Sequence, residues 1–413
     1  MTRWDALTTI CSYLRAGLLG GERPTTRDIV WELMVEVASF HYVTPALAAC
    51  LGADADVPPD IRNYFESAEA LNRQRNEEIF SGIARVAGLL NAIDIEPLLL
   101  KGAAHLVEGT YPEPSLRLLG DVDMLIPADR SADAVAALKA AGFHTKSSDV
   151  VPPPAHHHLP MLHDPENDLG VELHSDVVSR SPAAVIATPW FCEKARPVLF
   201  RNQRVLLPEP TRNAGHTVFH SEIYHGLYAL NKIQLRHLLD LAVIRARHEG
   251  AIDWNELDAR FSAAGHGEAL ATFLDFAREL LGQPAPKLGH APRHDAMTEL
   301  RSVQSRNSFQ FQIELLKSYC DSLQTALSLM TVERDRFQSE AGRLSASCTM
   351  LEAERNAFQG VVAAQTRLET ELADVTRSRA ELERELARVL ASPSWRFTEP
   401  LRKIVAASRR WWR

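Results

Sequence analysis

The stretch Gly120-Asp-Val-Asp-Met-Leu-Ile126 places two acids one residue apart at the start of an apolar run. A short apolar run indicates a buried strand, and strand side chains alternate between the two faces. Asp121 and Asp123 therefore point to the same side, about 7 Å apart along the strand. Two carboxylates in apolar surroundings are costly without cations. The stretch predicts a divalent-cation site, and the simpler alternative is a strand end with two solvated acids.

Two other segments offer groups that match these acids. Lys101 and Gly102 follow the apolar run Leu98–Leu100, and they provide a cation and a backbone that can approach a phosphate closely. Glu172 is an isolated acid in Val171-Glu-Leu-His174, on the second arm of a predicted hairpin. It would supply a third carboxylate, and Mg²⁺ prefers a few carboxylates together with substrate phosphates. The three segments together predict one phosphate- and metal-binding site.

The patterns on either side of this site define the fold class. Strand and helix patterns alternate between residues 93 and 185, whereas helical spacing of apolar residues covers residues 1–92 and 186–281. The polar run at residues 72–78 indicates a long helix with a solvated face. The sequence predicts an α+β protein: a small mixed-sheet core at 93–185 between an N-terminal helical segment and a C-terminal helical subdomain.

A linker and a heptad region follow this body. Residues 282–293 are rich in proline and glycine, and no proline lies between Pro292 and Pro393. Apolar residues there recur in steps of four and three, which predicts an α-helical coiled coil over residues 294–392. The alternative is a single long helix folded onto the body. A coiled coil would make the protein a homo-oligomer.

The tail, residues 393–413, is basic and aromatic. Between Trp395 and Arg413 it carries six lysines and arginines and one acid, Glu399, in a chain whose net charge is −8. Tryptophans interleaved with cations suit the interface of an anionic membrane. Docking of the tail on the acidic body, or on a partner protein, is the alternative.

The composition excludes several classes of protein. The chain has 413 residues, of which 46% are hydrophobic and 24% charged, so it is neither wholly disordered nor fibrous. Its acidic balance argues against nucleic acid as a partner. The five cysteines are scattered and form no CxxC pair, and no apolar run approaches the ~20 residues of a membrane span. We expect a cytoplasmic protein, peripheral at the inner face of the membrane if the tail binds there.

These residues resemble a known family, the bacterial "uncharacterised nucleotidyltransferase" family of the polymerase-beta-like nucleotidyltransferase superfamily. The resemblance covers about residues 1–270. It is carried by Leu98-Leu-Leu-Lys-Gly102, Tyr111-Pro, Arg117, Gly120-Asp-Val-Asp123, Val171-Glu-Leu-His174, Phe40-His-Tyr-Val-Thr-Pro-Ala-Leu47 and the helical part His216–Ala251 with Ile252-Asp-Trp254. Separately, Ser394–Arg402 resembles a short tail that follows coiled coils in bacterial polysaccharide-biosynthesis glycosyltransferases.

The resemblance implies a role for each matching acid. Asp121 and Asp123 would be the paired catalytic metal ligands and Glu172 the third carboxylate. Two Mg²⁺ ions, with Mn²⁺ as an alternative, would activate an acceptor hydroxyl and stabilise the pyrophosphate leaving group. The chemistry would be in-line attack on an α-phosphate.

The resemblance also implies four residues for the nucleotide phosphates. Lys101 and Gly102 stand where the wider superfamily has Gly-Ser, and the gap from Gly102 to Asp121 is longer than its usual spacing. Arg117 is the expected phosphate contact because of its bidentate guanidinium. His174 lies on the same strand face as Glu172, and we expect it to orient a phosphate or the acceptor.

We expect other polar residues to lie at the surface, in the core or at an interface rather than in the site. His156, His157 and His158 lack a zinc-like partner set, so we interpret them as surface residues. His216 and His220 lie four apart on a predicted helix and are interpreted as core or surface histidines. Asp240 is expected at a domain interface.

The sequence thus predicts a Mg²⁺-dependent nucleotidyltransferase that uses an NTP and a hydroxyl acceptor, linked to cell-envelope polysaccharide biosynthesis. The first alternative is a non-catalytic assembly or tethering protein built on the same fold. A phosphotransferase that passes on the γ-phosphate is the second alternative, and the lack of a Walker-type loop disfavours it.

Overall fold

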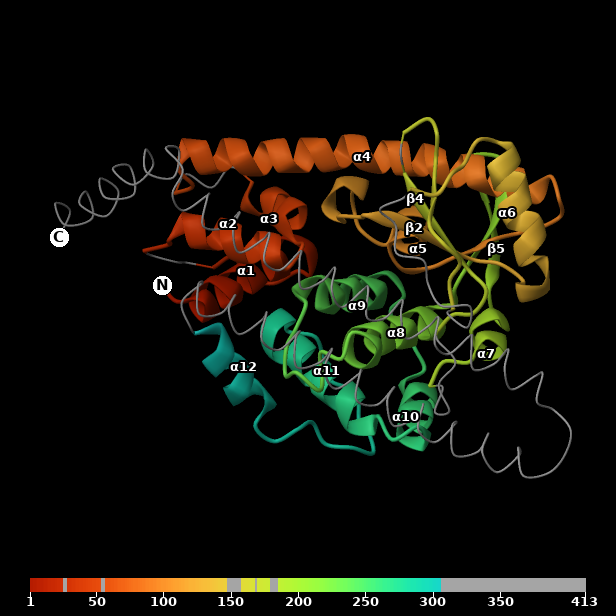
Figure 1. The fold of residues 1–413 in the computed structure, drawn as a ribbon. Coiled ribbons are helices and arrows are strands. Elements are labelled where there is room, and N and C mark those ends of the chain that lie inside the picture. The colour runs from red at the N-terminus through yellow and green to blue at the C-terminus, as the bar shows by residue number, and fades with distance from the viewer. Residues whose placement is uncertain (25–27, 53–55, 147–156, 168, 179–184, 306–413) are drawn as a thin grey trace, which may run out of the picture. The chain divides into compact units, whose positions relative to one another are not determined.

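The computed structural model describes residues 1–24, 28–52, 56–146, 157–167, 169–178 and 185–305 (Figure 1). These all fall within one compact unit, residues 1–318. The predicted coiled coil from residue 306 onward and the basic tail lie outside the described residues. Within the described ranges, no helix is both long and apolar enough to cross a membrane.

A mixed six-stranded sheet forms the centre of this unit, in the order β3-β4-β2-β1-β6-β5. The strands are β1 (Leu98–Leu99), β2 (Asp121–Leu125), β3 (Leu162–His163), β4 (Gly170–His174), β5 (Arg196–Phe200) and β6 (Gln203–Leu207). β2 runs parallel to β4 and antiparallel to β1, and β1 runs parallel to β6. The sheet and the helices around it confirm the α+β class.

The β5–β6 hairpin lies within residues 186–281, the range expected to form a C-terminal helical subdomain, and the sequence analysis did not predict these two strands. The two strands pair antiparallel, and β6 joins the sheet beside β1. Their turn is Arg201-Asn202, and both residues have positive φ, 45° and 65°. That geometry is typical of two-residue hairpin turns, which usually contain glycine. Because an arginine occupies the first turn position, the usual sequence signal for a hairpin is missing.

Helices surround the sheet. They are α1 (Arg3–Leu18), α2 (Trp31–Phe40), α3 (Thr44–Leu51), α4 (Pro59–Asn91), α5 (Lys101–Glu108), α6 (Ser131–Ala140), α7 (Thr188–Cys192), α8 (Pro210–Phe219), α9 (Leu235–Arg247), α10 (Trp254–Ala263), α11 (Gly267–Leu281) and α12 (Ala296–Gln304). The 33-residue helix α4 runs from the N-terminal helices to the sheet (Figure 1).

The two faces of the sheet pack against different helices, which decides where the site lies. Val122 and Met124 of β2 belong to a core cluster with α4 and α6 residues such as Ile83 and Leu138. Leu125, on the opposite face, belongs to a second cluster that includes α8, α9 and α11. Because strand side chains alternate, Asp121 and Asp123 share the face of Leu125 and point toward α8 and α9.

Helix α12 lies inside the range for which the coiled coil was predicted. Its Leu300 is fully buried in the core cluster that contains α9 and α11. Asn231 Nδ2 donates a hydrogen bond to the Ala296 carbonyl at 3.1 Å. The described part of residues 294–392 therefore packs against the body.

Candidate active site

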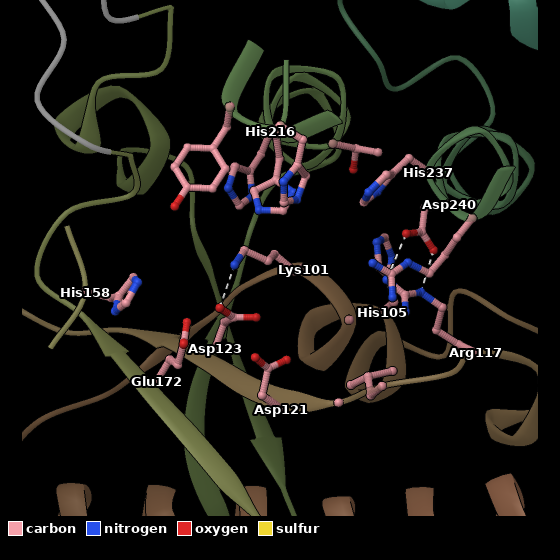
Figure 2. Close-up of a pocket in the computed structure, with 18 of the residues that line it drawn as sticks. Lys101, His105, Arg117, Asp121, Asp123, His158, Glu172, His216, His237 and Asp240 are labelled. Atoms are coloured by element: carbon pink, nitrogen blue, oxygen red, sulfur yellow. Dashed lines mark hydrogen bonds and ion pairs between the residues drawn. The ribbon is translucent and has the colours of Figure 1, made fainter. Parts of the chain in front are cut away.

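Strand pairing brings the three predicted carboxylates into one cavity. β2 and β4 are in register with Asp123 opposite Glu172, and Asp121 lies two residues away on the same face. Figure 2 shows all three side chains along one wall of a cavity of about 320 Å³. Asp123 is only 4% exposed, so the alternative of two solvated acids at a strand end does not hold for it.

Lys101 reaches the same wall from the start of α5. Leu100 donates a backbone hydrogen bond to the Asp123 carbonyl at 3.0 Å, which fixes the strand-to-helix turn beside β2. The Lys101 Nζ then lies 2.7 Å from Asp123 Oδ1. Lys101 has a positive φ of 49°, a conformation that costs a non-glycine residue energy and that concentrates at functional sites.

His174 contacts Asp123 but does not line the cavity. Its imidazole is fully buried, and its Nε2 lies 2.9 Å from Asp123 Oδ1 and 3.7 Å from Glu172 Oε2. Burial lowers the pKa of His174 although Asp123 opposes this, so the neutral ring donates its Nε2–H to the carboxylate. The ring is not among the residues that line the cavity. Its expected contact with a phosphate therefore stays a prediction, and its observed contact positions Asp123.

The carboxylates differ in their charge states. Burial would raise the pKa of Asp123, but the Lys101 ammonium and the His174 hydrogen bond hold it well below its usual range. Burial and the charge of Asp123 raise the pKa values of Asp121 and Glu172. The site therefore holds more negative charge than its own cations neutralise, which favours a bound cation.

Polar residues of α4 hold the loop that leads into β2. Asn76 Nδ2 donates to the carbonyls of Pro114 and Arg117 at 2.6 and 2.8 Å. Arg75 donates to the carbonyls of Leu119 and Gly120 at 3.0 and 2.8 Å. Asn72 Nδ2 likewise donates to two carbonyls of the same loop. The polar run of α4 is therefore only in part a solvated face, because these side chains fix the backbone just before Asp121.

Replacement of Asn76 by alanine should loosen this loop. Two hydrogen bonds to the loop would be lost, although both carbonyls keep a second donor, so we expect Asn76→Ala to lower the free energy of unfolding by about 0.5–1.5 kcal/mol. Gln74→Ala is the matched control, because Gln74 is exposed on the same helix and donates only to Glu78. Urea titrations of the full chain measure both. Equal stability of the two variants would contradict a role for Asn76 in holding the loop.

Arg117 is committed to a buried ion pair. Its Nε and Nη2 lie 2.8 and 3.0 Å from the two carboxylate oxygens of Asp240, and its Nη1 donates to the Leu118 carbonyl. Tyr111 donates its hydroxyl to Asp240 Oδ1 at 2.7 Å. These bonds occupy the guanidinium of Arg117. Its expected contact with a phosphate is not among them and stays a prediction. The pair instead joins the loop before β2 to α9 (Figure 2), as expected for Asp240 at an interface.

Gly102 lines the cavity, but packing gives it a further reason to be glycine. A Cβ at this position would lie 2.7 Å from the Leu119 side chain. Its approach to a phosphate stays a prediction.

Arg236 is a cation that the sequence analysis did not select. It lines the cavity from α9, and its guanidinium stacks 4.9 Å over the Tyr42 ring. Its Nε is buried without a hydrogen-bond partner, and no carboxylate of the described residues forms an ion pair with it. It is close enough to lower the pKa of Asp121. No local pattern in the sequence marks Arg236 as a site residue, because it lies on a helix far from β2 in the chain.

Several histidines face the carboxylates across the cavity. Figure 2 shows His216 and His237 on helices across the cavity from Asp121 and Asp123, whereas His158 lies beside Glu172. Lining histidines come from α5, from α8 and the turn after it, from α9, and from the segment before β3: His105, His157, His158, His216, His220, His225 and His237. We interpreted most of these as core or surface residues, because their distant sequence positions converge only in the fold.

The donor set fits a hard divalent cation. Asp121, Asp123 and Glu172 offer carboxylate oxygens, the ligands that Mg²⁺ and Mn²⁺ prefer. Single ligand atoms of Asp123, Glu172 and His174 lie within 4.8 Å of one another. The raised pKa values of Asp121 and Glu172 show that the carboxylates repel one another, and a cation would relieve this.

A family model described as "Uncharacterised nucleotidyltransferase" matches residues 27–282, which is more than half of the chain. The chain belongs to that family.

Two further comparisons add little. No curated protein matches the chain. A solved structure, an antigenic nucleotidyltransferase-like protein from Paracoccidioides brasiliensis, is 15% identical over 54% of this chain and 97% of that chain, with a TM-score of 0.32. That score is too low to support an argument about the fold.

Proposed function

We propose that the protein is a Mg²⁺-dependent enzyme that transfers a nucleoside monophosphate from an NTP to a hydroxyl acceptor. The observation that carries this proposal is the convergence of Asp121, Asp123 and Glu172 beside Lys101 in one cavity. Membership of the nucleotidyltransferase family supports the reaction class.

Asp121, Asp123 and Glu172 would hold the metal. When bound, Mg²⁺ supplies charge neutralisation at the triphosphate and at the reacting hydroxyl. His174 keeps Asp123 ionised and oriented through its Nε2–H, and it prevents rotation of the carboxylate away from the cavity. The loop held by α4 fixes Asp121 at the start of β2.

The proposed reaction forms one bond to the α-phosphorus of the NTP and breaks another. The acceptor oxygen forms a bond to the α-phosphorus while the bond from that phosphorus to the β-bridging oxygen breaks, and pyrophosphate leaves. Glu172 is the candidate to accept the hydroxyl proton, because burial and Asp123 raise its pKa above the usual value of a glutamate.

Lys101 and Arg236 would bind the triphosphate. Lys101 carries its charge at neutral pH, because the nearby acids raise its pKa despite burial. Arg236 adds a guanidinium that lines the cavity, and its planar group can bind phosphate oxygens in a bidentate way. We therefore assign to Arg236 the phosphate contact that the sequence suggested for Arg117.

Arg236→Ala should weaken NTP binding. Hydrogen bonds to a charged group contribute about 1.5–3 kcal/mol, so we expect the dissociation constant for the Mg²⁺–NTP complex to rise roughly 10- to 150-fold. Arg236→Lys should restore part of the affinity, because it keeps the charge but not the bidentate geometry. Arg247→Ala, an exposed arginine on the same helix, is the control. Unchanged NTP affinity in Arg236→Ala, measured by calorimetry, would remove Arg236 from the phosphate site.

Label position separates this proposal from its alternatives. The full chain is incubated with Mg²⁺ and each NTP labelled at the α- or the γ-phosphate, together with a pool of hydroxyl acceptors. Nucleotidyl transfer puts the α-label on the acceptor and the γ-label in pyrophosphate. A γ-label on the acceptor would indicate a phosphotransferase. If the chain neither transfers a label nor binds any NTP, the result would favour the non-catalytic assembly protein.

The heptads and the tail extend this proposal beyond the described residues. From their sequence we propose that the protein is a homo-oligomer and that its tail binds a membrane or a partner of a polysaccharide-synthesis machinery. Heptads at residues 294–392 and aromatic–basic alternation at 393–413 support these roles.

A further inference from the structure

A second group of possible metal ligands lies in the same cavity, apart from the carboxylates. His220, His225 and His237 each offer one imidazole nitrogen, and these atoms all lie within 4.8 Å of one another. All three rings line the cavity. None of them is a ligand in the mechanism derived above.

A π-helical turn brings two of these histidines together. The chain continues from α8 into the π-helical turn η3 (His220–Tyr224), and the His225 amide donates to the His220 carbonyl at 3.0 Å. This bond joins residues five apart, so the turn places their side chains on one side, and such turns are frequent at functional sites. The two ring centroids are 4.3 Å apart, with the rings nearly perpendicular.

His237 completes the group from α9. Its ring centroid lies 5.8 Å from that of His220 and 6.1 Å from that of His225. Asp240 lies one helical turn further along α9, where Tyr111 and Arg117 occupy its carboxylate oxygens.

The nitrogen atoms of the three imidazoles are available as metal ligands. None of them forms a hydrogen bond or ion pair with a residue that the structure describes. Packing of aromatic rings is the simpler explanation, but it does not account for the convergence of three imidazole nitrogens within 4.8 Å of one another. A bound ion would satisfy these nitrogens.

The charge of the cavity is compatible with a bound cation. The cavity lining contains four carboxylates against three lysine and arginine side chains, so its fixed charge does not exclude a cation.

We propose that His220, His225 and His237 bind a Zn²⁺ ion, with the fourth coordination position open to the cavity. Three histidines with one open position are a frequent donor set of zinc sites that bind water or substrate. Imidazole nitrogen suits Zn²⁺, whereas the carboxylates across the cavity suit Mg²⁺. The cavity would thus hold two ions of different classes on opposite walls. The open position would take an oxygen of the acceptor or of a phosphate.

Metal binding without nucleotide tests the zinc site. The full chain, freed of metal with a chelator, is titrated with Zn²⁺, and Co²⁺ serves as a spectroscopic probe of the donor set. We expect one Zn²⁺ per chain and a visible Co²⁺ spectrum of a site with nitrogen ligands. His225→Gln and His237→Gln should each weaken Zn²⁺ binding on the order of 100-fold.

The controls separate this site from the carboxylates and from surface histidines. Asp121→Asn should leave Zn²⁺ affinity unchanged, and so should His294→Gln, whose side chain is 96% exposed. His225 is the exposed member of the group, so His225→Gln keeps the test valid if His237→Gln fails to fold.

Three outcomes would overturn the zinc site. They are the absence of stoichiometric Zn²⁺ binding, Zn²⁺ that is lost in Asp121→Asn but kept in both histidine variants, and loss of NTP binding in His225→Gln without any Zn²⁺ bound by the wild type. The last would assign the histidines to anion binding. None of these results depends on nucleotidyl transfer, so the proposed function can survive the failure of the zinc site.

Discussion

Asp121→Asn is expected to lower kcat/KM for the NTP by about three orders of magnitude. The substitution keeps the size of the side chain but removes a metal-ligand charge. Loss of about 4 kcal/mol of transition-state stabilisation corresponds to roughly 10³ in rate. Pyrophosphate release by the full chain measures the effect. Asp129→Asn is the control, because Asp129 is exposed shortly after β2.

The same variant should fold at least as stably as the wild type. Burial and Asp123 raise the pKa of Asp121, so the ionised carboxylate destabilises the metal-free protein at neutral pH. Removal of that charge relieves the repulsion. A thermal melt without metal therefore distinguishes a functional acid from a structural one. An activity loss that accompanies a lower melting temperature would contradict this assignment.

The second large effect is expected for the buried pair of Arg117 and Asp240. Asp240→Asn would leave a buried guanidinium without its counter-charge, and loss of one partner of such a pair costs about 3–5 kcal/mol of unfolding free energy. Arg117 and Asp240 are 5% and 2% exposed, so solvent provides little compensation. Urea titrations of Asp240→Asn, Arg117→Met and the double variant measure the coupling.

A surface pair provides the comparison. Arg130 and Asp133 are in contact at 2.8 Å but are more exposed, so Asp133→Asn should change stability by less than about 1 kcal/mol. If Asp240→Asn cost no more than Asp133→Asn, the buried pair would not hold α9 to the loop before β2.

The stability that Asp240 contributes also has a defined pH dependence. Burial would raise the pKa of Asp240, but Arg117 holds it below its usual range, so folding lowers this pKa. The contribution is therefore complete above the unfolded pKa of about 3.9 and is lost as the pH falls through the lower folded value. Asp240→Asn should remove this part of the acid dependence.

The sequence was sufficient to predict which acids and which lysine share one wall of the cavity. Acids alternating on a buried strand, a lysine at a strand-to-helix turn and an isolated acid on a later strand are all local patterns, and the structure places Asp121, Asp123, Glu172 and Lys101 together. Their relative positions depend on the pairing of neighbouring strands, which the sequence did not predict.

The opposite wall was not predictable in the same way. Arg236 and the histidines lie on helices far from β2 in the sequence. A polar residue on a helix is interpreted as solvent-exposed unless its neighbours in the fold are known. Arg117 was expected at a phosphate because nothing in the sequence shows that Asp240 lies beside it. Asn72 and Asn76 were assigned to a solvated face for the same reason.

Metal-dependent NTP binding tests the central claim most directly, because it requires no knowledge of the acceptor. The full chain is titrated by calorimetry with each of the four NTPs, as analogues whose bond between the α- and β-phosphates resists cleavage, with Mg²⁺ and with chelator. We predict that at least one analogue binds, that Mg²⁺ strengthens its binding, and that Asp121→Asn but not Asp129→Asn abolishes the effect of Mg²⁺. Failure of all four to bind, or binding indifferent to Mg²⁺ and to Asp121→Asn, would contradict the assignment of this site.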